Sequence, residues 1–316
     1  MILNFRLGLF FISTAVIFWG ILPIALKLSA SFIDPVTLTW FRFLIALIVS
    51  FFIQFFTGKL QQFKQLTKAH WLKLAIAAIF SIFNYVSFVY CLEYLSPGQA
   101  QLNFQTAPFF LAFGGLILFK EKLKPVQMMC FATLALGMML FFNPYLDFSN
   151  TENNKIWLGI LIVQFSALSW TCYALIQKSL VKNLSPNNIL LFIYGFGLFA
   201  MMPFSDLNYF LKMNINEWWI VLFCAVNTLI AYGCFAQSMK YWPTSQVGPM
   251  IALTPILSFS STAFVAYLGW WPDKITSTSL DFTAIIGIAI VVLSVFGIQV
   301  LPKLLESRKL KLRTAC

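Results

Sequence analysis

The stretch from Asn84 to Glu121, NYVSFVYCLEYLSPGQAQLNFQTAPFFLAFGGLILFKE, contains the pattern on which the fold depends. It predicts an apolar helix, a break at Ser96-Pro97-Gly98, and a second apolar helix that ends in charged residues. The pattern recurs 147 residues further along the chain. The identities at that offset are Trp71 with Trp218, Tyr85 with Tyr232, Phe88 with Phe235, Tyr94 with Tyr241, Gln99 with Gln246, and Pro108 with Pro255. The chain therefore contains an internal duplication.

The composition excludes a water-soluble protein. Hydrophobic residues make up 60% of the 316 residues, charged residues make up 10%, and the mean hydropathy is +0.84. Soluble domains carry roughly a quarter charged residues. Because a bilayer crossing takes about 20 apolar residues, the chain predicts transmembrane helices. An outer-membrane barrel would show short segments of alternating polar and apolar residues, and the sequence has no such alternation.

The net charge of +11 could indicate nucleic-acid binding or membrane topology. The basic residues lie in short loops between apolar segments, as in cytoplasmic loops, so no nucleic-acid partner is expected. The six cysteines form no CxxC pair, and five lie in apolar segments, which indicates buried apolar side chains. We therefore expect no metal site, no disulfide framework and no cofactor. No cleavable signal is expected either, because residues 1–6 lead directly into a long apolar segment.

Ten apolar segments are candidates for membrane spans. They cover residues 7–28, 36–57, 71–94, 98–119, 124–143, 156–180, 187–210, 217–240, 245–268 and 281–302. With the N-terminus in the cytoplasm, 16 of the 21 basic residues lie on the cytoplasmic side and eight of the ten acidic residues lie on the other. This asymmetry predicts a multi-pass protein of the cytoplasmic (inner) membrane with both termini cytoplasmic.

The first and sixth segments match at an offset of 151, which relates Trp19 to Trp170, Lys27 to Lys178 and Pro35 to Pro186. Each half holds five segments, an odd number, so the second half enters the membrane from the opposite side. The predicted fold class is an all-α membrane protein with ten transmembrane helices as two inverted-topology five-helix repeats, the architecture of alternating-access transporters. The repeats cover residues 1–145 and 155–302, and residues 303–316 form a basic cytoplasmic tail that touches anionic lipid.

Several short motifs make the chain similar to a known family. They are Phe18-Trp19-Gly20, Asp34-Pro35, Trp40-Phe41-Arg42-Phe43, Tyr94-Leu95-Ser96-Pro97, Pro108 and Lys120-Glu121-Lys122-Leu123. In this order the sequence resembles, over essentially its whole length, the EamA family of the drug/metabolite transporter superfamily. The resemblance implies a ten-helix carrier that exports amino acids or related metabolites, although some relatives import nucleotide-like metabolites. One feature departs from the family pattern, since the acid that should match Glu121 is absent from the segment Tyr267-Leu268-Gly269-Trp270.

The substrate site of an inverted repeat is expected near the midplane, where the halves meet. Polar and aromatic residues inside apolar segments are the candidates, and the alternative for each is a hydrogen bond between helices. The predicted substrate-binding residues are Trp19, Arg42, Asn84, Tyr85, Gln101, Gln105, Trp170, Tyr173, Gln177, Asn227, Tyr232 and Gln237. Pro108 and Pro255 each free a backbone carbonyl one turn earlier, which either lines a cavity or only bends the helix.

Arg42 is a charge inside the second apolar segment, and two partners are open to it. It pairs with Asp34 or Glu93, the interpretation that we favour, or it meets a carboxylate on the substrate. No Asp or Glu lies at the centre of an apolar segment. A carrier that binds protons or cationic drugs through a central carboxylate needs such a residue. We therefore expect a uniporter or exchanger for neutral or zwitterionic metabolites.

Other functional classes fit the sequence less well. A membrane-embedded enzyme would need a nucleophile with a base, a metal cluster or paired acids at bilayer depth. The sequence shows none of these, so we expect no enzyme. The inverted repeat disfavours a channel. A lipid-intermediate flippase stays open, because an apolar aromatic cavity accepts an acyl chain. The expected partners are a small-molecule substrate and membrane lipid, and a monomer suffices because one chain supplies both halves.

Overall fold

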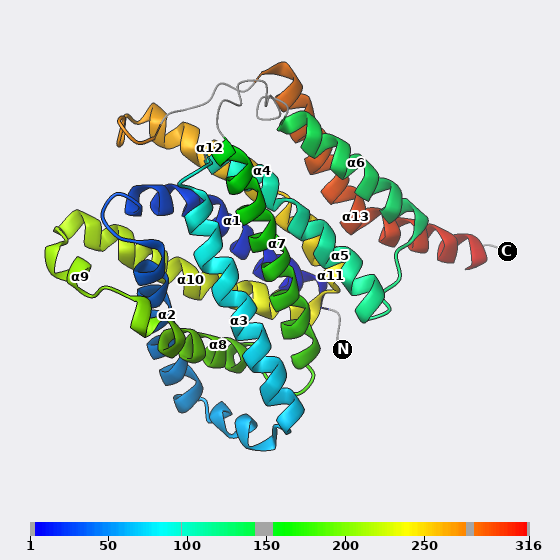
Figure 1. Cartoon of the computed structure of the whole chain (residues 1–316). Helices are drawn as coiled ribbons and strands as arrows, with labels where there is room; N and C mark the ends of the chain where they lie inside the picture. The colour runs from blue at the N-terminus through cyan, green and yellow to red at the C-terminus, as the bar shows by residue number, and fades with distance from the viewer. Residues whose placement is uncertain (1–3, 96, 143–153, 276–280, 315–316) are drawn as a thin grey trace.

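A computed structural model describes residues 4–95, 97–142, 154–275 and 281–314, and within these ranges the chain is helical, with no strand (Figure 1). The α-helices are α1 (Phe5–Ser29), α2 (Pro35–Phe56), α3 (Lys68–Cys91), α4 (Pro97–Phe104), α5 (Thr106–Leu118), α6 (Pro125–Phe141), α7 (Asn154–Leu180), α8 (Pro186–Met201), α9 (Asn208–Lys212), α10 (Ile215–Tyr241), α11 (Thr244–Ile251), α12 (Thr254–Tyr267) and α13 (Phe282–Thr314). Two 3₁₀ segments lie at Lys59–Gln65 and Met202–Phe204.

Eight of the described helical stretches are long and apolar enough to cross a membrane, if α11 is taken together with α12 and α8 with the 3₁₀ turn that follows it. Two further apolar helices, α5 and α6, are shorter. Each predicted apolar segment contains at least one helix, but the prediction for residues 187–210 is too long. There α8 ends at Met201 and a 3₁₀ turn follows. Pro203 explains the early end, because its ring clashes with the preceding turn and it has no N–H for the helix.

Two of the predicted segments form helices that are interrupted in the middle. One break separates α4 from α5 at Gln105, and the other separates α11 from α12 at residues 252–253. The last residues before the breaks, Phe104 and Ile251, lie four residues ahead of Pro108 and Pro255. A proline cannot donate a hydrogen bond to the carbonyl four residues earlier, so the helix opens at that carbonyl. The two breaks lie 147 residues apart, as do the repeated residues.

Local chemistry fixes where several helices begin. Asp34 caps α2 by accepting hydrogen bonds from the backbone N–H groups of Val36 (2.9 Å) and Thr37 (3.0 Å), with Pro35 in the first turn. Asn214 caps α10 in the same way, and Glu217 reaches back to the Asn214 N–H at 2.9 Å. These caps satisfy backbone donors that the helices leave unpaired.

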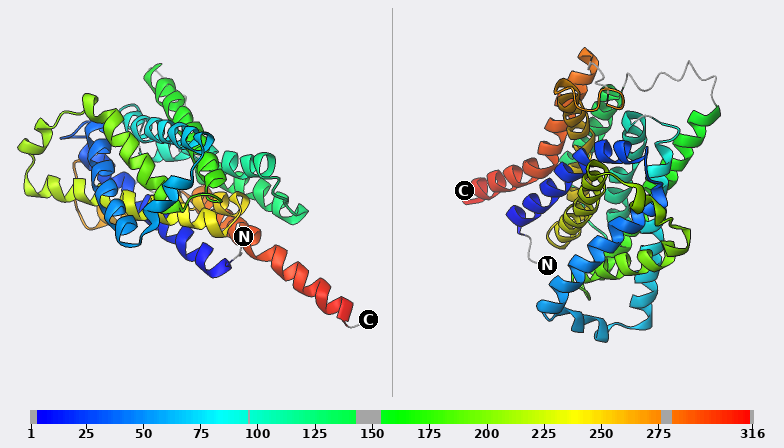
Figure 2. Two further views of the ribbon diagram at one scale, coloured as in Figure 1. Left: turned by 90° about the horizontal axis from the view of Figure 1, so that it is seen from below. Right: turned by 90° about the vertical axis from the view of Figure 1, so that its left-hand side faces the viewer.

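The helices pack in four main pairs, α1 with α10, α3 with α7, α2 with α8, and α6 with α13. Figures 1 and 2 show α6 and α13 running side by side at one edge of the bundle. At one end of the bundle the Phe5 ring stacks on Trp242, with centroids 5.2 Å apart. At the other end Lys274 Nζ donates to Ser31 Oγ at 2.7 Å. We call the first the Phe5 end and the second the Asp34 end, because Asp34 follows Ser31 in the turn between α1 and α2.

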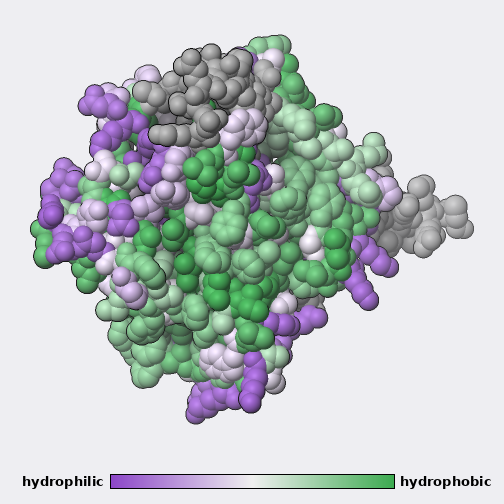
Figure 3. All heavy atoms as spheres, viewed as in Figure 1, coloured by the Kyte–Doolittle hydropathy of each residue, from purple (hydrophilic) through white to green (hydrophobic). Residues whose placement is uncertain are grey.

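Large apolar side chains cover the outside of the bundle between its two ends. Ile117 is 77% exposed, Phe199 is 72% exposed and Leu161 is 67% exposed. Figure 3 shows a green apolar surface across the middle of this face, with hydrophilic residues gathered at its upper left and lower edges. A soluble protein rarely exposes apolar patches of this extent, whereas lipid solvates them. The outer surface therefore matches a bilayer.

Candidate substrate site

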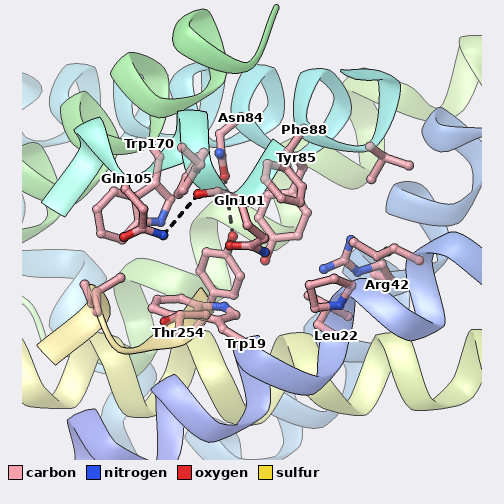
Figure 4. Close-up of a pocket in the computed structure, with 16 residues that line it drawn as sticks. Trp19, Leu22, Arg42, Asn84, Tyr85, Phe88, Gln101, Gln105, Trp170 and Thr254 are labelled. Carbon is pink, nitrogen blue, oxygen red and sulfur yellow. Dashed lines mark hydrogen bonds between the residues drawn. The ribbon is translucent and has the colours of Figure 1, made fainter. Parts of the chain in front are cut away.

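The candidate site is a cavity in the middle of the bundle, extending toward the Asp34 end. It is lined by residues of α1, α2, α3, α4, α7 and α10, and by the two helix breaks (Figure 4). It leaves about 80 Å³ for the centres of water-sized molecules. One buried water needs roughly 10–15 Å³ by this measure, so the cavity holds several waters or one small solute.

Four aromatic residues that the sequence repeat relates in pairs meet at this cavity. Trp19 and Trp170, which match at an offset of 151, pack edge to face with centroids 6.1 Å apart. Tyr85 and Tyr232, which match at 147, stack with centroids 4.8 Å apart. The Trp19 ring also contacts the Tyr232 ring at 5.2 Å. Each half of the chain thus contributes one Trp and one Tyr to a single aromatic cluster, which we call the aromatic box.

Amide groups beside the aromatic box tie the two halves together. Asn84 Nδ2 donates to Ser166 Oγ at 3.0 Å, and Ser166 Oγ donates to the Asn84 carbonyl at 3.0 Å. The Tyr232 hydroxyl donates to Asn84 Oδ1 at 3.4 Å. At the α4–α5 break, Gln105 Nε2 donates to the Gln101 carbonyl at 3.2 Å. These side chains give the cavity fixed polar groups in a mainly apolar wall, as is typical of small-molecule sites.

Arg42 brings a positive charge to the cavity wall although its side chain is only 2% exposed. Its Nε donates to Thr228 Oγ1 at 2.8 Å, and its guanidinium carbon lies 4.7 Å from the centre of the Tyr85 ring. The expected pairing with Asp34 or Glu93 is wrong. Asp34 accepts the backbone hydrogen bonds that cap α2, and Glu93 is exposed beyond the end of α3. No described carboxylate lies within ion-pair distance of the guanidinium.

The structure brings eight of the twelve predicted residues to the cavity and leaves four elsewhere. Those that line it are Trp19, Arg42, Asn84, Tyr85, Gln101, Gln105, Trp170 and Tyr232. Tyr173 packs behind Tyr232, with ring centroids 6.3 Å apart, and Gln177 is fully buried away from the cavity. Asn227 Nδ2 donates to the Phe18 carbonyl at 2.6 Å, and Gln237 Nε2 donates to Asn187 Oδ1 at 2.8 Å beside a separate groove.

The prediction missed several residues that line the cavity. Apolar members are Leu22, Pro23, Leu26, Phe88, Val89, Phe104 and Ile251, and Thr254 is the polar one. Three of them could have been predicted from the sequence. Phe104 and Ile251 precede Pro108 and Pro255 by four residues, and Thr254 directly precedes Pro255. The proline-induced breaks therefore line the cavity, which decides between the two interpretations of Pro108 and Pro255. The apolar members carry no signal that separates them from lipid-facing leucines.

The Phe5 end of the bundle is closed by a set of polar contacts that we call the Glu121 clamp. Glu121, which follows α5, accepts hydrogen bonds from the Thr244 N–H (2.9 Å), the Thr244 hydroxyl (2.9 Å) and the Ser245 N–H (3.0 Å). Lys178 of α7 donates to the carbonyl oxygens of Met239 and, at 2.6 Å, Trp242. Both charged groups hold the turn between α10 and α11, so this turn is fixed to α5 and α7.

Known proteins are similar to this chain over most of its length. The model of the EamA-like transporter family matches the chain twice, over residues 6–143 and 157–300. An uncharacterized inner membrane transporter of Escherichia coli K12, YhbE, is 30% identical over 90% of this chain and 89% of its own length. An uncharacterized transporter of Haemophilus influenzae is 29% identical over 94% and 97% of the two chains.

More distant proteins extend the likeness. A probable amino-acid metabolite efflux pump of Salmonella typhimurium is 22% identical over 90% of this chain and 93% of its own. A solved crystal structure that is 18% identical superposes with a TM-score of 0.68, over 93% of this chain and 97% of the other, which shows a shared fold. With the family model matching both halves of a helical chain that is apolar on the outside, the protein belongs to the EamA-like transporter family.

Proposed function

We propose that the protein is a secondary transporter that moves small polar metabolites, chiefly amino acids or related compounds, across the cytoplasmic (inner) membrane by alternating access, as a uniporter or exchanger with export as the favoured direction. The observation that carries the proposal is the central cavity, where paired aromatic residues from both halves surround amide groups and one guanidinium. Because residues of both halves line this cavity, a rocking of one half against the other would open it to each side of the membrane in turn.

The ten-helix inverted repeat is part of this proposal. Counting α4 with α5 and α11 with α12 as single broken spans gives five spans in each half. Exchanging the halves maps the pair α1–α10 onto α7–α3, and it maps the pairs α2–α8 and α6–α13 onto themselves. Trp19 touches its own counterpart Trp170, as Tyr85 touches Tyr232. Residues that touch their own counterparts are expected beside a two-fold axis, which supports a pseudo-two-fold axis through the aromatic box.

The substrate class follows from the size and chemistry of the cavity. Space for several waters is on the scale of an amino acid and below that of a nucleotide or a lipid chain. The distant relative from Salmonella is named a probable amino-acid metabolite efflux pump, which supports the same class. We therefore favour amino acids over nucleotide-like metabolites and over a lipid-flippase function.

The sidedness of the transporter follows from its charges. The Phe5 end carries most of the basic residues in the turns, so we assign it to the cytoplasm together with both termini. The Glu121 clamp then closes the cytoplasmic side, and the cavity extends toward the outside. This arrangement supports an outward-facing conformation. We expect a monomer to suffice, and cross-linking in lipid discs that shows an obligate dimer would contradict this.

Removal of a cavity side chain is expected to abolish most of the flux of amino acids into proteoliposomes. Trp170→Ala takes away an aromatic wall, and Gln105→Ala takes away an amide at the helix break. We expect each variant to lose about tenfold or more in initial rate, the effect of roughly 1.4 kcal/mol of binding. Gln237→Ala is the matched control, because it also removes an amide from a long apolar helix, α10, but at a position outside the cavity. Equal losses in all three variants would show a folding defect and would contradict the assigned site.

Amino-acid flux is expected to be the same with and without an imposed proton gradient. None of the described residues that line the cavity carries a carboxylate, and proton coupling at the site would need a group that gains and loses a proton there. Uptake of radiolabelled amino acids is measured with the interior at equal pH and at a pH one unit higher. Accumulation above equilibrium that depends on the gradient would contradict uniport or exchange and would direct attention to Glu93.

A further inference from the structure

We propose that Arg42 binds the carboxylate of the transported molecule, so that the carrier accepts compounds with one free carboxylate and rejects the corresponding esters and amines. This inference rests on the proposed function and narrows it, because it names the group on the substrate that the cavity requires and the residue that reads it.

The charge of Arg42 has no partner of opposite sign within the described part of the chain. A guanidinium has five N–H donors, and only the Nε–H of Arg42 makes a hydrogen bond to a described residue, Thr228. The other contact is the face of the Tyr85 ring, which attracts a cation but does not neutralise it. A charged side chain inside a membrane protein is costly unless it is paired, and such residues mark substrate or ion pathways.

In the part of the chain that the structure describes, the acids nearest to Arg42 in the sequence and the acid of the clamp are engaged or placed elsewhere. Asp34 caps its own helix with two backbone hydrogen bonds, and Glu93 is exposed. Glu121 lies at the opposite end of the bundle, where three hydrogen bonds hold it in the clamp. We therefore assign the anionic partner that completes the site to the ligand. A planar guanidinium matches a carboxylate through two parallel hydrogen bonds, which is the geometry that the terminal N–H groups of Arg42 can still offer.

The charge balance selects a single negative charge. Among the lining residues that the structure describes, Arg42 is the one with a cationic side chain. One carboxylate neutralises the guanidinium, so the ammonium of a zwitterion is the only charge left to place, on the side of the cavity away from Arg42, whereas a phosphate dianion leaves an excess negative charge in an apolar wall. An amine or an amino-acid ester brings a second positive charge into the same small space, and like charges at such distances in a low-dielectric site repel strongly.

The opposite side of the cavity offers a place for the second polar group of an amino acid. Figure 4 shows Arg42 entering from α2 on one side, with Gln105, Trp170 and Thr254 on the other. Gln105 Oε1 and Thr254 Oγ1 are buried and make no hydrogen bond to a described residue. An ammonium group donates to such oxygens and is attracted by the faces of the aromatic box. A zwitterion lying across the cavity would therefore place its carboxylate at Arg42 and its ammonium near Gln105.

The test uses the purified full-length protein in lipid discs and proteoliposomes with three matched pools of compounds. The pools are the twenty amino acids, their methyl esters, and their N-acetyl derivatives, so that the first and third keep the carboxylate and the second does not. Stabilisation against heating measures binding, and competition with radiolabelled amino-acid flux measures access to the transport site. We expect the amino-acid pool to bind at least tenfold more tightly than the ester pool, and the N-acetyl pool to retain binding.

Variants of Arg42 separate its charge from its shape. Arg42→Gln should bring the ratio of acid to ester binding close to one, and Arg42→Lys should keep a reduced preference, because the ammonium retains the charge but not the two-pronged geometry. Should Arg42→Gln fail to fold, the three pools on the unaltered protein still decide the question. Equal binding of esters and acids, or an Arg42→Gln protein that still prefers acids tenfold, would overturn the inference.

The outcomes for Arg42 and for transport can be told apart. Amino-acid flux that esters inhibit as well as acids do would leave the proposed transport intact and refute the role of Arg42. Carboxylate-dependent binding that is lost in Arg42→Gln, without flux of any amino acid, would support the role of Arg42 and contradict the proposed transport.

Discussion

Glu121→Ala is expected to loosen the closed end of the bundle and to raise amide hydrogen exchange in residues 241–251 about tenfold or more. The substitution removes the acceptor of three hydrogen bonds and leaves the Thr244 and Ser245 N–H groups at the start of α11 without their partner. Hydrogen bonds to a charged group are worth about 1.5–3 kcal/mol each when protected from water, and the half-buried Glu121 falls toward the lower end of that range. The prediction is checked by measuring amide hydrogen exchange with mass spectrometry on the protein in lipid discs.

Two further variants make the result of Glu121→Ala specific. Glu121→Gln keeps an acceptor oxygen without the charge, so its exchange should lie between those of the unaltered protein and Glu121→Ala. Glu93→Gln changes an exposed acid at the other end and should leave residues 241–251 unaffected. Unchanged exchange in Glu121→Ala would mean that packing alone, without the clamp, holds the Phe5 end closed.

The sequence does not repeat the residues of the clamp in the other half, as two matched positions show. The residue that matches Glu121 is Leu268, which carries no acceptor. The residue that matches Thr244 is Pro97, which has neither the N–H nor the hydroxyl that Glu121 binds. The second repeat thus lacks the acid, and the turn of the first repeat lacks the groups that such an acid would bind. The three hydrogen bonds of the clamp therefore belong to the Phe5 end, and the repeat does not supply the same residues for an equivalent clamp in the other half.

Gly287→Ala is expected to lower the thermal stability markedly. A Cβ at this position would lie 2.3 Å from the backbone nitrogen of Phe141 and 2.7 Å from the carbonyl oxygen of Gly137. Both are backbone atoms of α6, so neither can rotate away, and α6 and α13 would have to separate. Helices in membranes associate through such close contacts of small residues. Adding a group to a tight interface typically costs about 1–3 kcal/mol, and backbone clashes lie at the upper end.

The matched control for Gly287→Ala is Gly233→Ala in α10. A Cβ at Gly233 meets no atom within 4 Å, and the backbone there is helical, so this variant should melt at the same temperature as the unaltered protein or slightly above it. Melting is measured in detergent by the fluorescence of the tryptophans. Equal melting temperatures for the two variants would contradict the close approach of α6 and α13.

Much of the fold was accessible from the sequence because membrane spans are decided locally. A stretch of apolar residues must form a helix in lipid, where no water can satisfy its backbone, and each predicted segment contains a helix. Prolines are equally local in effect. Pro108 and Pro255 interrupt the helices where the missing N–H requires it, and Pro203 ends α8 earlier than hydropathy alone predicts.

The candidate site was predicted less completely, for a geometric reason. Asn227 and Gln237 each lie five residues from Tyr232, which is about 140° around a helix of 3.6 residues per turn, so they point to α1 and α8 and not to the cavity. Gln177 lies on the same side of α7 as Trp170, but seven residues separate them, about 10 Å along the axis. Helical spacing identifies a face, whereas the depth of the cavity along that face depends on the neighbouring helices.

The sequence by itself determined the class of protein, the helical segments, the duplication and the aromatic residues that the duplication repeats, because each depends on residues close together in the chain or on a simple offset. Only the tertiary structure decided which partners the charged groups have. Arg42 does not pair with Asp34, which caps α2, or with Glu93, which is exposed. Glu121 binds a turn more than a hundred residues further along the chain. Such pairings depend on how helices from both halves pack, and no local pattern records that packing.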